Sequence, residues 1–160
     1  MLLKICQFLH DLSISTTVRE SLWVFPTLEW IHIYSMIFLI SVIAAFDLRL
    51  MGLAVGRGPR QPLSDLLRRV LRWALASFAV NFVTGSLLFM SKAPDYYMNS
   101  AFRIKILLIF VGILYHYSLL PRLKWQEQNP HVSLGAKAAG AFSLALWVGV
   151  IAASRWIAFV

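Results

Sequence analysis

Two histidines stand inside long apolar stretches of the sequence, and His32 is the stronger candidate for chemistry. Glu29 precedes it by three residues and Met36 follows it by four, so on a helix these side chains share one face. Imidazole is the commonest metal ligand in proteins and a frequent axial ligand of haem iron. We predict that His32 ligates haem iron, with Glu29 orienting the ring. The alternative is a purely structural histidine, hydrogen-bonded to Glu29 or to a neighbouring helix.

Arg103 and Lys105 open a later apolar stretch, at a predicted depth close to that of Glu29 and His32. As cations they can pair with Glu29 or bind the propionates of a haem. The alternative is that both side chains snorkel to the membrane interface, which requires no partner.

His116 follows Lys105 by eleven residues, three helical turns along the same face. Helical rise separates the two by roughly 16 Å, which places His116 toward the opposite side of the membrane. One haem cannot easily take both histidines as axial ligands. We keep His116 among the cofactor-binding candidates, although Tyr115 and Tyr117 beside it favour an interface residue in an aromatic belt.

The elements that position these residues are membrane spans. The chain has 160 residues, of which 59% are hydrophobic and 14% are charged, whereas soluble domains carry about 25% charged residues. A small globule cannot bury so many apolar side chains, because small domains bury only a modest fraction of their surface. The fold class predicted is therefore all-α, a polytopic membrane protein with a four-helix transmembrane bundle.

A span requires about 20 mostly apolar residues. We expect spans at residues 25–46, 73–90, 104–120 and 135–159, the third ending at Pro121, within a single membrane domain over 1–160. Residues 1–24 are predicted to form one or two helical pieces in the membrane interface. The alternative for this segment is an ordered tail packed over the bundle.

Polar and small residues inside the spans predict helix packing. Ser77, Asn81 and Thr84 fall on one face of the second span, where they are expected to form interhelical hydrogen bonds. Gly85 beside them lets a neighbouring helix approach.

Two further patterns concern the first and fourth spans. Small residues recur every four positions in the fourth span and predict a close helix contact within or between protomers: Ala141, Ala145, Gly149 and Ala153. Asp47 and Arg49 end the first span and are interpreted as a charge pair near the first loop.

Basic residues set the expected orientation. Nine flank the first and third loops: Arg49, Arg57, Arg60, Arg68, Arg69, Arg72, Arg122, Lys124 and Lys137. Six flank the other side: Lys4, Arg19, Lys92, Arg103, Lys105 and Arg155. Cytoplasmic flanks collect Lys and Arg, so both termini are expected in the periplasm and the protein in the bacterial inner membrane.

The remaining composition excludes other classes. The net charge is +8, but the bases lie between apolar runs and not along a groove, so no nucleic-acid partner is expected. The single cysteine, Cys6, cannot form an internal disulfide. The expected partners are the lipid bilayer and either a second copy of the chain or a larger membrane complex.

Four segments carry a resemblance to known families: FPTLEWIHIYSMIF, FDLRLMGLAV, VTGSLLFM and AFRIKILLIFVGILYHYSLL. Over roughly residues 23–120 the chain resembles a family of uncharacterised bacterial four-span membrane proteins, with DLRLMG and TGSLLF the most distinctive pieces. More distantly it is similar to the HemJ-type protoporphyrinogen oxidases and the CopD-type copper-resistance membrane proteins. His32, Lys105, Tyr115 and His116 occupy the places of the histidine, lysine and Tyr-His pair of those families. The HemJ resemblance implies a b-type haem and electron transfer.

Together these observations predict a membrane protein that binds haem b near the outer face and serves in electron transfer or redox chemistry. The expected site comprises His32 as the metal ligand, with Glu29, Arg103, Lys105 and His116 as further cofactor-binding residues. The alternative is a non-redox scaffold or accessory subunit that packs through its small-residue helix faces. A catalytic residue is not assigned.

Overall fold

The chain folds into helices joined by short connections. The computed structural model describes residues 2–53, 63–126, 133–157 and 159, and the backbone alone for 63–64 and 120–126. Its helices are α1 (Leu2–His10), α2 (Ser13–Glu20), α3 (Val24–Leu50), α4 (Leu63–Ser91), α5 (Ala93–Met98), α6 (Ser100–Gln126) and α7 (Leu134–Trp156). No strand occurs in these described residues.

Four of the helices, α3, α4, α6 and α7, are long and apolar enough to cross a bilayer, with mean hydropathies of 1.5 to 2.0. Their outward surfaces carry large apolar side chains that a soluble protein would bury. Trp73, Phe82 and Leu107, for example, are 62%, 65% and 61% exposed. Lipid is the solvent that such a surface requires, and the predicted all-α four-span bundle is confirmed.

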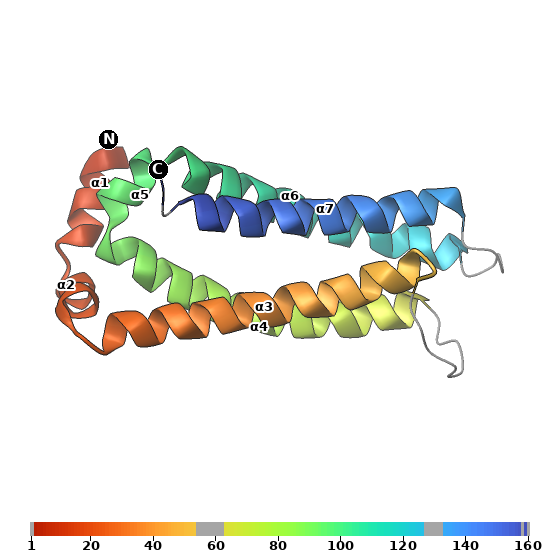
Figure 1. Cartoon of the computed structure of the whole chain (residues 1–160), viewed down its shortest axis with the longest axis horizontal. Helices are drawn as coiled ribbons and strands as arrows, with labels where there is room; N and C mark the ends of the chain where they lie inside the picture. Colours follow the sequence, from red (N-terminus) through yellow and green to blue (C-terminus); the bar gives the residue numbers. More distant parts are fainter. Residues whose placement is uncertain (1, 54–62, 127–132, 158, 160) are drawn as a thin grey trace.

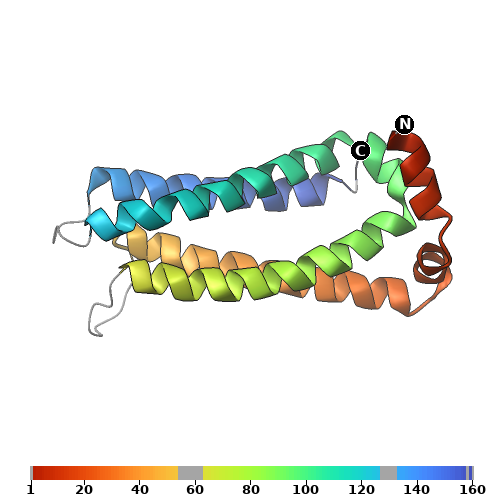
Figure 2. The ribbon, with the colours of Figure 1, turned by 180° about the vertical axis from the view of Figure 1, so that it is seen from behind.

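The long helices form two antiparallel pairs, α3 with α4 and α6 with α7 (Figure 1). Both chain ends lie at one end of the bundle, with α1, α2 and α5; we call this the terminal end and the adjacent part of the bundle the terminal half. The α3–α4 and α6–α7 connections lie at the opposite, loop end, beside the loop half. The two pairs lie closest in the loop half and diverge toward the terminal end, as the reverse view also shows (Figure 2).

Two helix boundaries differ from the predicted spans. Helix α4 begins at Leu63, ahead of the apolar span expected from residue 73, because the basic stretch with Arg68, Arg69 and Arg72 leads into that span on the same helix. Helix α6 does not stop at Pro121 but runs on to Gln126. Proline costs a helix one hydrogen bond and strains the preceding turn, but helical residues on both sides can carry the helix through it.

The N-terminal segment forms two short helices that cover the terminal end. The Ser15 hydroxyl donates to the Leu9 carbonyl at 2.6 Å and closes α2 against α1. The Arg19 guanidinium contacts the His10 ring at 3.1 Å and donates to the Ser91 carbonyl, at the end of α4, at 3.4 Å. These bonds match an ordered tail packed over the bundle, which was the alternative to a free interfacial segment.

The apolar core is concentrated in the loop half. The buried apolar residues of α3 and α4 that join it are Leu39, Ile43, Phe46, Leu50, Leu67, Val70 and Ala74. Toward the terminal end this core is absent from both helices. All residues from 85 to 90 of α4 are partly buried. Six successive residues face every direction around a helix, so no side of this stretch is fully buried in an apolar core.

The two helix pairs approach each other closely at Gly140 of α7. A Cβ at this position would lie 2.8 Å from the Asp47 carbonyl oxygen and 2.7 Å from Cγ of Met51. Ala141 and Ala145 of the predicted small-residue stripe are exposed instead, although Ala153 is buried and Gly149 is half-buried against Leu108. Within one protomer the stripe therefore packs only through Gly149 and Ala153, because the packed face of α7 is rotated toward Gly140 and Ser143. The contact of Ala141 and Ala145 between protomers stays a prediction.

Candidate functional site

His32 is held on α3 by the facing backbone of α4. Its Nδ1 lies 3.1 Å from the Asn81 carbonyl oxygen and 3.1 Å from the Thr84 hydroxyl. A carbonyl oxygen only accepts, so Nδ1 carries the hydrogen and Nε2 carries the lone pair. Among the residues that the structure describes, none forms a hydrogen bond with Nε2. A histidine held in this way, with Nδ1–H on a backbone carbonyl, has the geometry of a metal ligand with its supporting partner.

Polar side chains of α4 bind α3 around this histidine. Asn81 Nδ2 donates to the His32 carbonyl at 2.9 Å and to Ser35 Oγ at 3.0 Å. The Ser77 hydroxyl donates to the Ser35 carbonyl at 2.6 Å. The predicted interhelical hydrogen bonding by Ser77, Asn81 and Thr84 is confirmed. We call His32, Ser35, Ser77, Asn81 and Thr84 the terminal-half seam.

The absence of a side chain at Gly85 leaves space for the His32 ring. A Cβ on Gly85 would lie 2.9 Å from Cε1 and 3.4 Å from Nδ1 of His32, closer than carbon atoms pack. The predicted close approach at Gly85 is therefore made by an imidazole ring lying over the glycine backbone. Any other residue at position 85 would displace the ring from its hydrogen bond.

The charged residues predicted around His32 are only partly brought together. The Lys105 side chain, from α6, is half-buried and lies within electrostatic reach of the His32 ring. Glu29 is exposed, and its charge acts on Tyr96 of α5: burial raises the pKa of the Tyr96 phenol, and Glu29 and Asp95 raise it further.

Arg103 is engaged elsewhere. Its Nε and Nη2 donate to the Tyr97 carbonyl at 3.0 and 2.9 Å, and its guanidinium lies over the Tyr97 ring at 5.4 Å. Glu29 forms no ion pair with Arg103 or Lys105 in the described part of the chain. Of the two roles considered for these cations, pairing with Glu29 is therefore not observed in the described residues. The charge of Glu29 acts on Tyr96 of α5, while Arg103 bonds the Tyr97 carbonyl of the same short helix.

His116 occupies a different environment in the loop half. It is 3% exposed, and its Nδ1–H donates to the Gly112 carbonyl at 2.9 Å. Its Nε2 lies 3.3 Å from the Ser143 hydroxyl of α7 and accepts that hydrogen. The prediction that His116 is an interface residue is wrong, since the side chain points into the bundle and Tyr117 alone of its neighbours faces out, 54% exposed.

Asp47 is the residue that sequence reasoning misjudged most. It was interpreted as half of a charge pair with Arg49, but its side chain is 0% exposed and neither carboxyl oxygen bonds any described residue. The Ser143 side chain lies beside it. The spacing puts Asp47 one turn after Ile43 on the same face of α3, but the sequence does not show that this face points into the core. We call Asp47, His116 and Ser143 the loop-half cluster.

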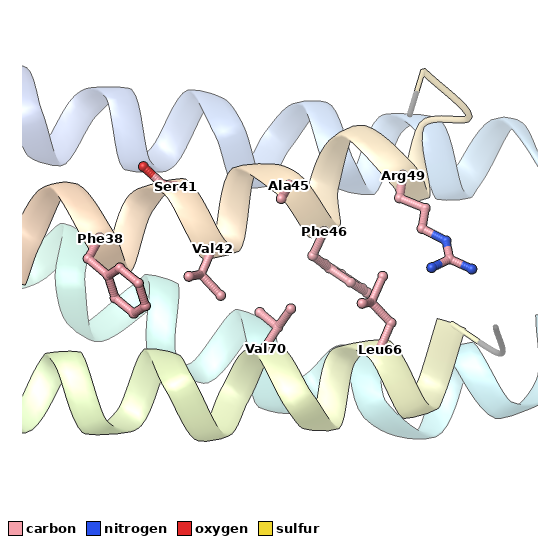
Figure 3. A pocket seen from close by; sticks show the side chains of 8 residues that line it. All are labelled: Phe38, Ser41, Val42, Ala45, Phe46, Arg49, Leu66 and Val70. Atoms are coloured by element: carbon pink, nitrogen blue, oxygen red, sulfur yellow. The ribbon is translucent and has the colours of Figure 1, made fainter. Parts of the chain in front are cut away.

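The described residues contain no group of three His, Cys, Asp or Glu side chains that could hold a bare metal ion. A shallow apolar groove of about 420 Å³ runs between α3 and α4 in the loop half (Figure 3). Its lining comprises Phe38, Ser41, Val42, Ala45, Phe46, Arg49, Leu66 and Val70. Neither histidine reaches this groove, so it is separate from the terminal-half seam and from the loop-half cluster.

Comparison with known proteins gives one match. Residues 22–160 match the family described as "Family of unknown function (DUF6644)". The chain belongs to this family. The match contains all four long helices of this DUF6644 protein together with His32 and His116, and it leaves α1 and α2 outside. No curated protein and no solved structure matches the chain, so the distant similarity to HemJ-type and CopD-type proteins stays a prediction.

Proposed function

We propose that this four-span membrane protein binds a b-type haem through His32 and serves in electron transfer. The observation that supports this most is the state of the His32 ring. Nδ1–H is held by the Asn81 carbonyl at 3.1 Å, and Nε2 keeps its lone pair without a described partner. His116, by contrast, has both ring nitrogens engaged.

The residues present fit a haem better than they fit a bare metal ion. Haem iron takes most of its ligands from the porphyrin and requires one or two from the protein, so a single free histidine suffices. The terminal half also lacks the buried apolar core of the loop half, and no residue from 85 to 90 of α4 is fully buried. The absence of that core favours a bound apolar cofactor in this half.

The side chains around His32 have separate roles in this proposal. The Asn81 carbonyl and the Thr84 hydroxyl fix the ring orientation and its tautomer. Lys105, half-buried at the level of His32, offers positive charge to propionates. A haem held there would supply one-electron redox chemistry.

The test is the visible absorption spectrum of the purified protein, oxidised and reduced. We expect a Soret band and sharp reduced bands in the wild type, and their loss in His32→Ala. His116→Ala is the matched control, because it also removes an imidazole from a membrane span but should retain most of the bound haem. A colourless wild type, or a His32→Ala protein with full haem occupancy, would overturn the proposal.

The second candidate is a non-redox scaffold or accessory subunit. One observation favours it: Ala138, Ala141 and Ala145 form an exposed small-residue face on α7, where a helix of another subunit can approach closely. A colourless protein that co-purifies with a membrane partner, and loses it in Ala141→Leu, would favour this function over haem binding.

The location that fits the proposal is the bacterial inner membrane with both termini in the periplasm. Both termini share one end of the bundle (Figure 1), so one measurement orients all four spans. Tags fused at either terminus should report the periplasm. The expected cytoplasmic insertion points, Gly58 and Gln128, lie outside the described residues. If a tag at Gly58 is labelled from outside while both termini are protected, the orientation is the reverse of the one expected.

A further inference from the structure

The loop-half cluster contains the only two titratable side chains among the buried polar residues that the structure describes. The other members of that set are serines, an asparagine and a threonine: Ser15, Ser77, Ser91, Ser143, Asn81 and Thr84. Asp47 and His116 come from α3 and α6, and Ser143 of α7 stands between them. Ionisable groups inside the membrane are costly and are typical of ion pathways and proton relays.

The donors and acceptors in the loop-half cluster follow from the hydrogen bonds of His116. His116 Nδ1–H donates to the Gly112 carbonyl, so Nε2 is an acceptor and takes the one hydrogen of the Ser143 hydroxyl. Ser143 therefore has only lone pairs left for Asp47 beside it. Ser143 can form a hydrogen bond with the Asp47 carboxyl only as an acceptor, which requires that the carboxyl itself carries a hydrogen.

An ionised Asp47 would have only the Ser143 hydroxyl beside it as a donor, and His116 Nε2 accepts that hydrogen. Neither of its oxygens accepts a hydrogen bond from a described residue, and its side chain is fully buried. Burying a carboxylate without a donor is far more costly than burying the neutral acid. Trp147, one turn after Ser143, has an Nε1–H that is likewise buried without a described partner. Both carboxyl oxygens of Asp47 and the Trp147 N–H are therefore buried polar atoms without a hydrogen-bond partner among the described residues.

Among the residues whose side chains the structure describes, the charged groups on the surrounding helices do not reach into this cluster as partners. Arg68, Arg69 and Arg72 of α4 and Lys137 of α7 are exposed. Arg49, on the same helix as Asp47, donates no hydrogen bond to that carboxyl. Tyr115 of α6 donates its hydroxyl to the Ala139 carbonyl at 2.7 Å. His116 is thus the titratable side chain that shares the interior with Asp47.

We propose that Asp47 is a membrane-embedded proton-binding site and that Ser143 and His116 relay its proton. The Oδ–H bond of Asp47 breaks as Ser143 Oγ takes the proton, and the Ser143 O–H bond breaks as His116 Nε2 takes that hydrogen. The serine hydroxyl is restored, and the products are a carboxylate and an imidazolium. Total charge in the cluster is unchanged, which avoids adding net charge to the membrane interior. The relay needs no haem and is independent of His32.

Infrared spectroscopy of the purified protein in H2O and D2O tests the site. The wild type should show the C=O stretch of a protonated carboxylic acid at neutral pH, shifted in D2O. Asp47→Asn should remove this band, and Glu29→Gln, which changes an exposed carboxyl on the same helix, should leave it. Ser143→Ala should keep the band and shift its frequency, because the acid loses its acceptor. Absence of the band in the wild type, or its persistence in Asp47→Asn, would refute the site.

Exchange kinetics test the relay separately. The Asp47 band should convert from its H2O to its D2O position more slowly in Ser143→Ala, on the order of a hundredfold if the hydroxyl carries the proton. Ser154→Ala is the matched control on α7, because Ser154 donates only to the Val150 carbonyl of its own helix. Equal exchange rates in wild type and Ser143→Ala would show that the proton travels by another route.

Discussion

The two halves of the bundle each contain a histidine, and the two rings differ in the hydrogen bonding of Nε2. In both, Nδ1–H is fixed on a helix carbonyl: that of Asn81 for His32 and that of Gly112 for His116. In the loop half, Nε2 of His116 is used by Ser143 inside a packed core. In the terminal half, Nε2 of His32 has no described partner and lies beside a stretch of α4 without a fully buried residue. The same side chain is thus engaged next to the buried core and available where that core is absent.

Backbone contact explains the difference in packing. The α3 and α7 backbones meet at Gly140, where a Cβ would come within 2.8 Å of the Asp47 carbonyl oxygen. In the terminal half, α5 and the two N-terminal helices lie between the ends of the diverging pairs (Figure 1). Each prediction below changes one side of this contrast.

The largest expected effect is on the loop half. Gly140→Ala places a methyl group against backbone that cannot move aside, and overpacking of this kind typically costs about 1–3 kcal/mol. Gly149→Ala is the control, because its Cβ would meet Leu108 Cδ1 at 3.4 Å, an ordinary contact. Thermal unfolding in detergent should show a clear loss for the first variant and little for the second. Equal stabilities would mean that the helices are packed no more tightly at Gly140 than at Gly149.

A glycine in the terminal half should behave differently. Gly85→Ala would place Cβ 2.9 Å from Cε1 of His32, but a ring at the end of a side chain can rotate away. We expect little loss of stability, loss of the Nδ1–H signal bonded to Asn81 in nitrogen NMR of labelled histidines, and weaker haem binding by about tenfold to a hundredfold. An unchanged His32 signal would show that the ring does not rely on the glycine.

Interhelical bonds of the seam should contribute less. Asn81→Leu removes the side-chain bonds to the His32 carbonyl and Ser35 at similar volume. Such bonds in membranes average about 0.6 kcal/mol, with a maximum of about 1.7 kcal/mol. The Asn81 backbone carbonyl remains, so the His32 tautomer should persist. Unfolding measurements and histidine NMR together check this, and a lost tautomer would mean that the side chain positions the ring.

The smallest effect concerns Glu29 and pH. Burial raises the pKa of Tyr96 above its ordinary value of 10.0, and Glu29 raises it further because its negative charge repels the phenolate. Glu29→Gln should therefore lower this pKa, so that the phenol ionises at a less alkaline pH. An ultraviolet titration of the tyrosines, with Tyr96→Phe to identify the signal, measures the shift. A shift in the opposite direction would show that Glu29 does not act on Tyr96.

Local patterns predicted much of this protein correctly. Hydropathy over windows of span length located all four long helices, and helical spacing placed Ser77, Asn81 and Thr84 on one face. Helical rise separated His32 from His116 in depth, and the structure puts them in different halves. These features depend on composition and on the 3.6-residue period, which a sequence displays directly.

The tertiary structure alone decided which face of each span points inward. In a soluble helix the apolar face marks the interior, but lipid-facing and core-facing side chains in a membrane are equally apolar. Hydropathy therefore could not show that Asp47 is fully buried, that α7 packs through Gly140 and not through Ala141 and Ala145, or that Glu29 faces Tyr96. Nor could it show which ring nitrogen of His32 is free, because that follows from a carbonyl on α4, 49 residues away in the chain.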